Sequence, residues 1–213
     1  MKQKNIKLNL GCGSTLTEGW INVDNSPNAL LAKFPGYKFL KWILYKLRII
    51  STNAYQANWD KNIVHCNLMK RFPKIGSNNC TVIYSSHFIE HIPYEKTVAL
   101  LKHCYSGLDS GGILRIAVPD LYTEAKDYVK RIEEALKKGL EDDTAGKDFI
   151  HHMISRQKRH AHLFMYDLFS LTAILREIGF INIEKKKFLE SSIQEIELVE
   201  KREDSLFIEC RKL

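Results

Sequence analysis

A chain of 213 residues, 45% of them hydrophobic, is long enough to bury the core of one domain without disulfide bonds or metal ions to stabilise it. Its five cysteines are odd in number, scattered and without a C-x-x-C pair, which indicates free thiols in a reducing cytosol rather than a disulfide framework. The net charge of +7 would favour an anionic partner, but a solvated surface explains it equally well.

The sequence contains no uncharged apolar run of membrane-spanning length. Residues 1–4 lead directly into the first predicted strand, which leaves no room for a signal peptide. We therefore expect a cytoplasmic protein. Because no internal repeat or clear boundary is visible, we expect one domain over residues 1–213, with helical insertions at about 25–60 and 121–165.

The N-terminal stretch places a glycine turn between two short apolar strands. Ile6–Leu10 is typical of a buried strand and runs into Gly11–Ser14, and a second apolar run, Ile21–Val23, ends on Asp24. Glycine allows a sharp turn and lets a ligand approach main-chain atoms. An acid at the end of the next strand can accept both hydroxyls of a ribose. Together these features predict a nucleoside-binding crevice.

Spacing within this stretch distinguishes among nucleoside ligands. A dinucleotide fingerprint requires a third glycine and an acid about 20 residues further on. Here Leu16 stands in place of that glycine, and Asp24 comes 11 residues after Gly13. The turn also lacks a lysine or arginine for a pyrophosphate and the Gly-Lys-Ser/Thr ending of a P-loop. A ligand with a ribose but no phosphate is favoured, and S-adenosylmethionine fits.

The next segment, from Asn25 to Asp60, contains no obvious strand. Within it, residues 37–50 place apolar side chains at helical spacing, with lysines and an arginine between them. Such a helix can pack on the sheet and close part of the active-site mouth. It can also lie on an anionic membrane surface, because Phe39, Trp42 and Tyr45 broaden the apolar stripe. Both interpretations stay open.

Strands and helices alternate through the rest of the chain, as in an α/β fold with a mostly parallel sheet. The predicted strands are 63–68, 81–84, 113–118, 181–184 and 206–210, and the predicted helices are 93–108, 121–138, 149–155 and 167–178. Residues 141–146 form a predicted loop. The last two strands alternate in polarity, which is typical of an edge hairpin with one wet face.

Four stretches in the same order resemble motifs of class I S-adenosylmethionine-dependent methyltransferases. Leu8–Gly13 and Gly19–Asp24 resemble the first two motifs, Ile83–Ile92 resembles the stretch after the fourth strand, and Leu108–Ile116 resembles the turn into the fifth strand. The resemblance covers nearly the whole chain and is strongest to the small bacterial type-11 group. It implies a Rossmann-like α/β fold with a mostly parallel seven-stranded sheet flanked by helices, the last strand antiparallel.

The resemblance implies S-adenosylmethionine as cofactor, held beyond the carboxyl ends of the strands. The residues that it places there are Asn9, Gly11, Cys12, Gly13, Ser14, Asp24, Asn67, Leu68, Ser85 and Ser86. Asn67 stands where the family usually has an aspartate that accepts the adenine amino group, and Asn9 also stands where an acid is common. An amide oxygen can accept the same hydrogen bond without the charge.

Methyl transfer often requires removal of one proton from the acceptor, and His87 is the first candidate for this base. It follows a predicted buried strand, and histidine side chains ordinarily exchange protons near neutral pH. The alternative is that His87 only orders its loop. Glu90 and His91 would share a helical face with it, so one of them can orient it or contact substrate. Asp120 is the rival base or an anchor for a substrate hydroxyl.

Four further histidines lie among cationic residues between His151 and His162. Because the cluster lacks carboxylates and fits no helical zinc pair, we predict no metal site. Recognition of an anion, or a plain basic loop, is favoured. His160 and His162 are the candidate substrate residues of this cluster.

These observations predict a methyltransferase that acts on an oxygen or nitrogen of a small or carrier-linked metabolite, with sugar derivatives suggested by resemblance only. A protein that binds the cofactor without catalysis is the alternative that Asn9 and Asn67 leave open. An NAD-dependent enzyme is disfavoured by the missing third glycine. A nucleic-acid partner is disfavoured because no aromatic residues interleave a basic stripe. The sequence does not predict the oligomeric state.

Overall fold

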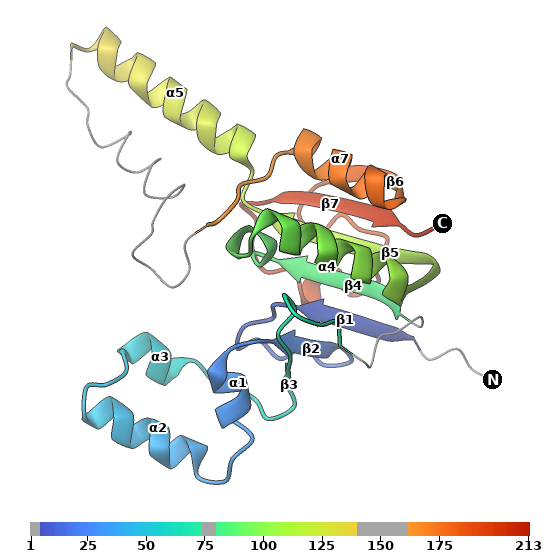
Figure 1. The fold of residues 1–213 in the computed structure, drawn as a ribbon. Coiled ribbons are helices and arrows are strands. Elements are labelled where there is room, and N and C mark those ends of the chain that lie inside the picture. Colours follow the sequence, from blue (N-terminus) through green and yellow to red (C-terminus); the bar gives the residue numbers. More distant parts are fainter. Residues whose placement is uncertain (1–4, 74–79, 140–161) are drawn as a thin grey trace.

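The computed structural model describes residues 5–73, 80–139 and 162–213 (Figure 1). These residues form one seven-stranded sheet in the order β3-β2-β1-β4-β5-β7-β6. The strands are β1 (Ile6–Leu10), β2 (Ile21–Asp24), β3 (Val64–His65), β4 (Cys80–Ser86), β5 (Leu108–Val118), β6 (Ile181–Lys186) and β7 (Leu206–Arg211). All neighbours pair in parallel except β7, which runs antiparallel to both β5 and β6. The predicted fold class is confirmed.

The strand order reverses at β1, which pairs with β2 on one side and β4 on the other. Leu10, the last residue of β1, is in register with Val23 of β2 and Ser85 of β4. The carboxyl ends of the three strands therefore lie side by side. This is the point of an open α/β sheet at which ligands bind.

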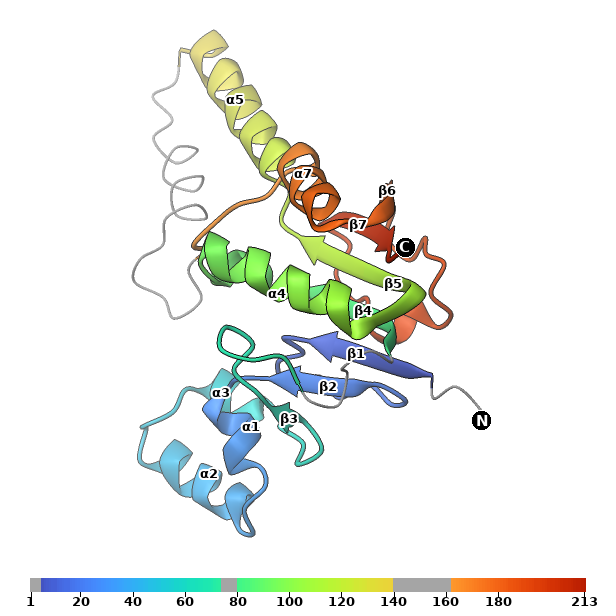
Figure 2. The same ribbon diagram turned by 45° about the vertical axis from the view of Figure 1, so that its right-hand side comes forward.

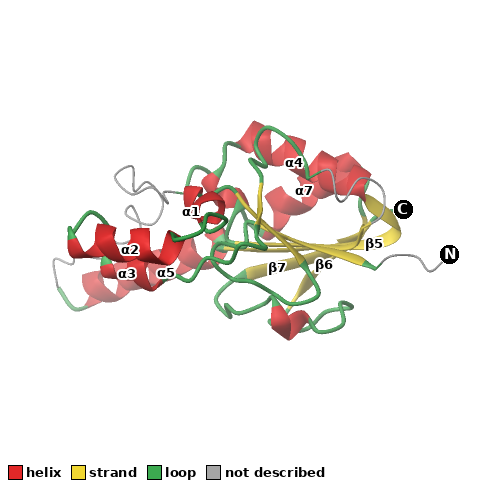
Figure 3. Ribbon diagram, turned by 90° about the horizontal axis from the view of Figure 1, so that it is seen from below, coloured by secondary structure: helices red, strands yellow, loops and turns green. Residues whose placement is uncertain are grey.

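Two helices cover one face of the sheet, α4 (Tyr94–Gly107) and α7 (Leu168–Ile178) (Figure 3). Their apolar residues pack on Leu8, Ile83 and Leu114 of the central strands in the main core cluster. The predicted ends of α7 are confirmed: Asp167 caps its first turn, and Gly179 ends it with a positive φ of 111°.

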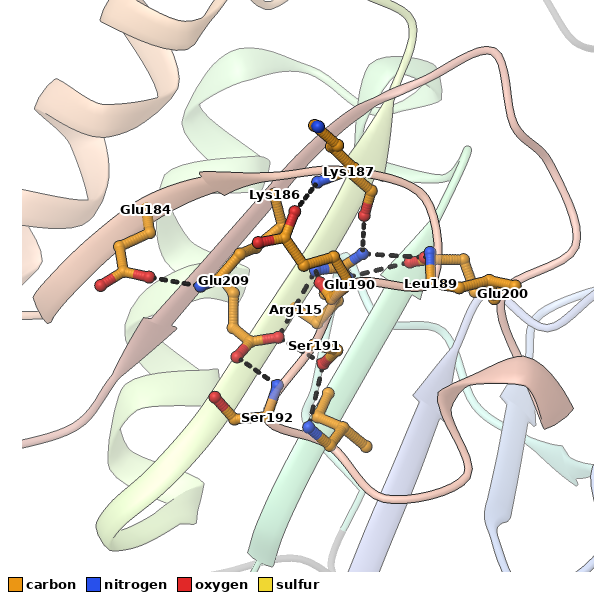
Figure 4. Close-up of polar contacts among 11 residues, drawn as sticks. Arg115, Glu184, Lys186, Lys187, Leu189, Glu190, Ser191, Ser192, Glu200 and Glu209 are labelled. Atoms are coloured by element: carbon orange, nitrogen blue, oxygen red, sulfur yellow. Dashed lines mark hydrogen bonds and ion pairs between the residues drawn. The ribbon is translucent and has the colours of Figure 1, made fainter.

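The opposite face is covered by loops and by the short 3-10 helix Ile196–Leu198 instead of long helices (Figure 3). Trp20 packs edge-on against Tyr84 in a second apolar cluster on this side, with ring centroids 6.4 Å apart. Beside it lies Arg115 of β5, completely buried, which pairs with Glu200 at 2.8 Å and Glu209 at 3.5 Å (Figure 4). The arginine also donates to the backbone carbonyls of Lys187 and Glu190.

The other α-helices of the described residues lie beyond the carboxyl ends of the strands, at the end of the sheet opposite the two chain termini (Figures 1 and 2). They are α1 (Pro27–Leu31), α2 (Tyr37–Lys46), α3 (Thr52–Gln56) and α5 (Leu121–Lys137). The predicted helix over 37–50 is wrong in its extent, because the chain leaves the helix after Lys46 and Arg48 has a positive φ of 57°. In the described part of the chain, no helix is long and apolar enough to cross a membrane.

Two strand predictions need correction. The third strand is only Val64–His65, because Asn67 begins a turn in which its carbonyl accepts the N–H groups of Lys70 and Arg71. The last two strands do form an antiparallel pair at one edge of the sheet, with β6 outermost, but β7 lies between β5 and β6 and is buried, so it lacks the predicted wet face. The polarity of β7 alternates because Glu209 is a buried polar residue that faces Arg115, and not because one face of the strand is in water. The predicted helix over 149–155 and the loop over 141–146 lie outside the described residues.

Candidate functional site

The glycine turn after β1 is tied directly to the acid at the end of β2. Oδ2 of Asp24 accepts a hydrogen bond from the N–H of Gly13 at 2.9 Å, and Oδ1 accepts one from Ser26 at 2.6 Å. The N–H groups of Gly11 and Cys12 both donate to the Val23 carbonyl. A carboxylate offers about four acceptor positions, so two remain on the half-buried Asp24 for other donors. Two vicinal hydroxyls of a ribose are donors of the required kind.

The two glycines of the turn meet different surroundings. Gly11 and Gly13 both have a positive φ, of 69° and 59°. A Cβ at Gly11 would lie 2.5 Å from the ring of Phe88, whereas one at Gly13 would have no atom within 4 Å. Gly11 thus permits close packing of the turn on the loop after β4, while Gly13 leaves its backbone open on one side. The Cβ-free side of Gly13 is the surface that a ligand can approach.

Cys12 lies between these glycines and is half-buried. Burial raises the pKa of its thiol to about 12, and the nearby negative charge of Asp24 acts in the same direction. The thiol is therefore protonated at neutral pH and is not a nucleophile. Its Sγ lies 3.4 Å from the Gly13 carbonyl within the turn, and its place among the cofactor residues stays a prediction.

Asn9 has a structural partner that the sequence did not reveal. Its side-chain N–H donates to Oδ1 of Asn22 at 3.1 Å, and both amides are almost completely buried. Asn22 also accepts from the N–H of Thr17 and donates to the carbonyls of Thr17 and Trp20. The Asn9–Asn22 pair therefore fastens the loop between β1 and β2. The signal in the sequence that could have pointed to Asn22 is its polar amide between the apolar residues Ile21 and Val23.

The other predicted cofactor residues lie near the same end of the sheet. Asn67 accepts the N–H of Met69 at 3.1 Å in a local turn, and Leu68 is buried in the core. Ser85 is buried beside Leu10, and its hydroxyl has no hydrogen-bond partner among the described residues. Ser86, the last residue of β4, is half-buried. An orphan hydroxyl next to the glycine turn fits a ligand that brings a polar group to this point.

His87 follows β4 with a positive φ of 48°, a conformation uncommon for a side chain with a Cβ. Its Nε2 lies 2.8 Å from Oγ of Ser205, and its Nδ1 lies 3.4 Å from Oε1 of Glu90. The N–H of His87 donates to the carbonyl of Ala117 on β5. The imidazole therefore has a partner at each ring nitrogen, with a carboxylate behind Nδ1 and a hydroxyl in front of Nε2, while the backbone is fixed to β5. Ser205 was not predicted, because it lies 118 positions away in the sequence.

Glu90 is completely buried, and neither of its carboxylate oxygens has a hydrogen-bond partner among the described residues. Nitrogens of the His87 and His91 imidazoles lie 3.4 and 3.8 Å from its Oε1. Burying an uncharged polar group without a hydrogen bond costs about 2 to 7 kcal/mol, and burying a charged carboxylate costs more. Glu90 therefore depends on these rings to offset the cost of its burial. Its position behind His87 suits the orientation of that ring better than contact with substrate.

One group of side chains has the spacing of metal ligands in the described part of the chain. Ligand atoms of Glu90, His91 and His162 all lie within 4.8 Å of one another, and the rings of His91 and His162 are 5.0 Å apart. We predicted no metal from the sequence, and that stays a prediction. His160, like the rest of the cluster from 151 to 161, lies outside the described residues.

Asp120, the rival base, caps α5. Its Oδ1 accepts the N–H of Tyr122, and its Oδ2 accepts the Thr123 hydroxyl and pairs with Lys185 at 3.6 Å. Because both oxygens already have partners, the structure gives Asp120 a capping role that was not predicted. A catalytic role for it stays a prediction.

Two cavities of the described residues lie away from this crevice. One, of about 350 Å³, opens at the amino end of the sheet and is lined by Lys7, Thr81 and Gly111 among others. The other, of about 380 Å³, lies beside α2 and is lined by Phe34, Tyr37 and Trp59 among others. The glycine turn borders neither of these two cavities, so the argument for the site rests on the polar groups at the strand ends.

Comparison with known proteins adds evidence at the level of the fold. No protein-family model and no curated protein matches the sequence. Solved structures that match include a putative O-methyltransferase from Nostoc punctiforme, with a TM-score of 0.52 and 10% identity over 100% of this chain and 53% of that one. The S-adenosylmethionine-dependent methyltransferase SibL matches with a TM-score of 0.51 and 12% identity over 99% of this chain and 51% of that one.

A third match is phosphoethanolamine N-methyltransferase 2 from Haemonchus contortus, solved with phosphomonomethylethanolamine and S-adenosylhomocysteine. Its TM-score is 0.50 at 16% identity, over 100% of this chain and 49% of that one. The chain thus spans about half the length of these three proteins. With the sheet order and the single antiparallel strand, these matches show that the chain has the Rossmann-like fold of class I S-adenosylmethionine-dependent methyltransferases.

Proposed function

We propose that the chain is an S-adenosylmethionine-dependent methyltransferase, similar to the type-11 group, that works in the cytoplasm. Its acceptor is an oxygen or nitrogen of a small or carrier-linked metabolite, and a sugar derivative is the class we favour. The observation that carries the proposal is the carboxylate of Asp24 against the Gly13 N–H at the reversal point of the sheet. The absence of a basic residue in this turn supports a ligand without phosphates.

Different residues of the crevice would bind different parts of S-adenosylmethionine. Asp24 would accept the ribose hydroxyls, the open side of Gly13 would admit the amino-acid portion, and Asn67 would accept the adenine amino group. Bound S-adenosylmethionine would supply a methyl group on a positively charged sulfur, a leaving group that needs no further activation. The protein then has to align the acceptor with that methyl group and remove one proton.

His87 is the group placed to take that proton. An acceptor hydroxyl or amine that replaces the Ser205 hydroxyl, 2.8 Å from Nε2, would lie within the distance that proton transfer requires. The proton would move to Nε2 as the acceptor atom bonds to the methyl carbon, and the electrons of the broken carbon–sulfur bond would return to sulfur. Glu90 behind Nδ1 would orient the ring and stabilise its protonated form.

Titration calorimetry with S-adenosylmethionine tests the cofactor, and an assay for S-adenosylhomocysteine over a panel of acceptors tests turnover. We expect binding, and release of the product only with a suitable acceptor. An absence of binding would contradict the proposal. NADH serves as the comparison ligand, because tighter binding of a dinucleotide would favour the related dehydrogenase activity.

A second candidate is a partner protein that binds S-adenosylmethionine without catalysis. It is favoured by Asn9, whose uncharged side chain is buried and donates to Asn22 at a position where the resemblance leads us to expect an acid. It predicts calorimetric binding with no product from any acceptor in the panel. The two candidates therefore differ only in the second assay.

A further inference from the structure

The segment between β2 and β3 has an unusual charge balance. Between Asp24 and Asp60 the sequence contains five basic residues and no acidic one. The five are Lys33, Lys38, Lys41, Lys46 and Arg48. All of them except Lys41 are exposed. This stretch therefore carries a concentrated positive charge that the modest net charge of the chain does not reveal.

The same segment exposes large apolar side chains. None of the ten residues of α2 is buried, and the side chains of Phe39, Leu47 and Ile49 are 66, 64 and 65% exposed. Further exposed apolar residues in the segment are Leu30, Leu31, Phe34, Leu40 and Trp42. We call residues 30–49 the α2 patch. Monomeric soluble proteins rarely leave so many large apolar side chains together in water without a binding role.

One side of α2 is already used for packing on α3. Tyr45 stacks on Tyr55 with ring centroids 4.3 Å apart, and Lys41 donates to the carbonyl of Ala57. The ring of Phe39 stacks instead on Trp42 of the same helix, at 5.8 Å. Both of these rings are exposed, as are the neighbouring Lys38 and Lys46. The outer face of α2 thus combines aromatic rings with lysines, while the inner face anchors the helix.

We propose that the α2 patch docks on a membrane surface that contains anionic lipids. An amphipathic helix with Trp, Phe and Leu on one face and lysines beside them inserts its apolar side at the boundary between headgroups and acyl chains. Each lysine near such a surface adds a favourable electrostatic contribution. A nucleic acid would match the charge but would leave the exposed leucines and isoleucine in water, so lipid is the better match.

The position of the patch relates it to the crevice. α1 follows β2 after Asp24, so the segment extends from the carboxyl end of the strand that carries the proposed ribose ligand. Figure 2 shows α2 projecting beyond this end of the sheet. Docking through α2 would bring the crevice close to the lipid surface, where a lipid-linked acceptor is found. The docking itself requires no methyl transfer.

Co-sedimentation of the full chain with vesicles tests the proposal. One set contains phosphatidylcholine alone, and the other contains phosphatidylcholine and phosphatidylglycerol in equal amounts. We expect binding to the anionic vesicles, little binding to the neutral ones, and weaker binding in concentrated salt because salt screens the lysines. No cofactor or acceptor is added, so failure here would leave the proposed methyl transfer untouched.

Two double variants separate the apolar and charged contributions. Phe39→Ser with Trp42→Ser is expected to weaken binding about tenfold or more, because the rings no longer leave water. Lys38→Glu with Lys46→Glu is expected to weaken it about tenfold or more as well. Because these side chains are exposed, both variants should fold, which circular dichroism checks.

Matched controls change the same residue types elsewhere. Phe169→Ser alters an aromatic ring of α7 that is 81% exposed, and Lys96→Glu with Lys102→Glu alters two exposed lysines of α4. All three control substitutions should leave binding unchanged. Equal binding of the wild-type chain and the α2 variants would overturn the proposal, as would equal binding to neutral and anionic vesicles. A dimer that Phe39→Ser with Trp42→Ser abolishes, without vesicle binding, would assign the patch to a second copy.

Discussion

Oδ2 of Asp24 accepts a hydrogen bond of 2.9 Å from the backbone N–H of Gly13. This contact joins the end of β2 to the turn after β1, so the same carboxylate that is proposed to bind the ribose also shapes the turn. Its other oxygen accepts the N–H of Ser26, the residue that caps α1. A change at Asp24 is therefore expected to affect ligand binding and the local fold together.

Asp24→Ala is expected to weaken S-adenosylmethionine binding about 10- to 100-fold, because a charged hydrogen-bond acceptor contributes about 1.5 to 3 kcal/mol. Asp24→Asn should weaken it less, since the amide oxygen still accepts one donor. Calorimetry measures both. Asp60→Ala, which removes an acid from a different loop, is the control and should bind normally. Unchanged affinity in Asp24→Ala would place the ribose elsewhere.

Gly11 and Gly13 differ in what surrounds them, and this difference predicts unequal costs of substitution. Gly11→Ala has to accept both a positive φ and a Cβ 2.5 Å from the Phe88 ring, so we expect a loss of about 3 kcal/mol in the free energy of unfolding. Gly13→Ala meets only the backbone strain, about 1 to 2 kcal/mol. Urea denaturation measures both.

Gly19→Ala is the matched control, because Gly19 also has a positive φ, of 76°, and open space around its Cβ position. It should lose as much stability as Gly13→Ala. If Gly11→Ala were no worse than these two, the Phe88 ring would have to move aside at little cost.

The fold was largely predictable because its elements are local patterns. The glycine turn, the helix that Gly179 ends and the buried run in β4 each follow from a few adjacent residues. The extents of β3 and α2 were not predictable, because a turn at Asn67 and a positive φ at Arg48 end these elements against their apolar pattern. The burial of β7 depends on its pairing with β5, which is distant in the sequence, so alternation alone suggested one wet face.

The site was predictable in its position but not in its partners. His87 was predicted because it follows the end of a strand, but its partner Ser205 lies 118 positions further along the sequence. Arg115 is a structural residue inside β5, and its partner Glu200 lies 85 positions further on in an irregular loop. Asn9 was expected at the cofactor, and only the folded chain shows that Asn22 holds its side chain. Long-range polar contacts leave no periodic signal, so the sequence alone cannot assign them.

His87→Ala is expected to lower turnover about 10²- to 10⁴-fold and to leave S-adenosylmethionine affinity unchanged, because a general base acts on the acceptor and not on the cofactor. The measurement is product release with the best acceptor of the panel, beside calorimetry. His103→Ala removes an exposed histidine of α4 and should have no effect. Ser205→Ala frees Nε2 and should not slow turnover. A His87→Ala enzyme with normal turnover would remove His87 as the base.

Arg115→Met is expected to lower the free energy of unfolding by about 3 to 5 kcal/mol, because it leaves two buried carboxylates without their cation. The guanidinium contacts Glu200 through two nitrogens, at 2.9 and 2.8 Å, and also holds the loop before β7 through backbone carbonyls. Urea denaturation measures the loss, and Arg176→Met on the exposed side of α7 should change stability by less than about 0.5 kcal/mol. Adding Glu200→Gln to Arg115→Met should recover part of the loss, since one uncompensated charge is removed. A double variant no more stable than Arg115→Met would show that the backbone contacts of the guanidinium, and not its ion pairs, hold this face of the sheet.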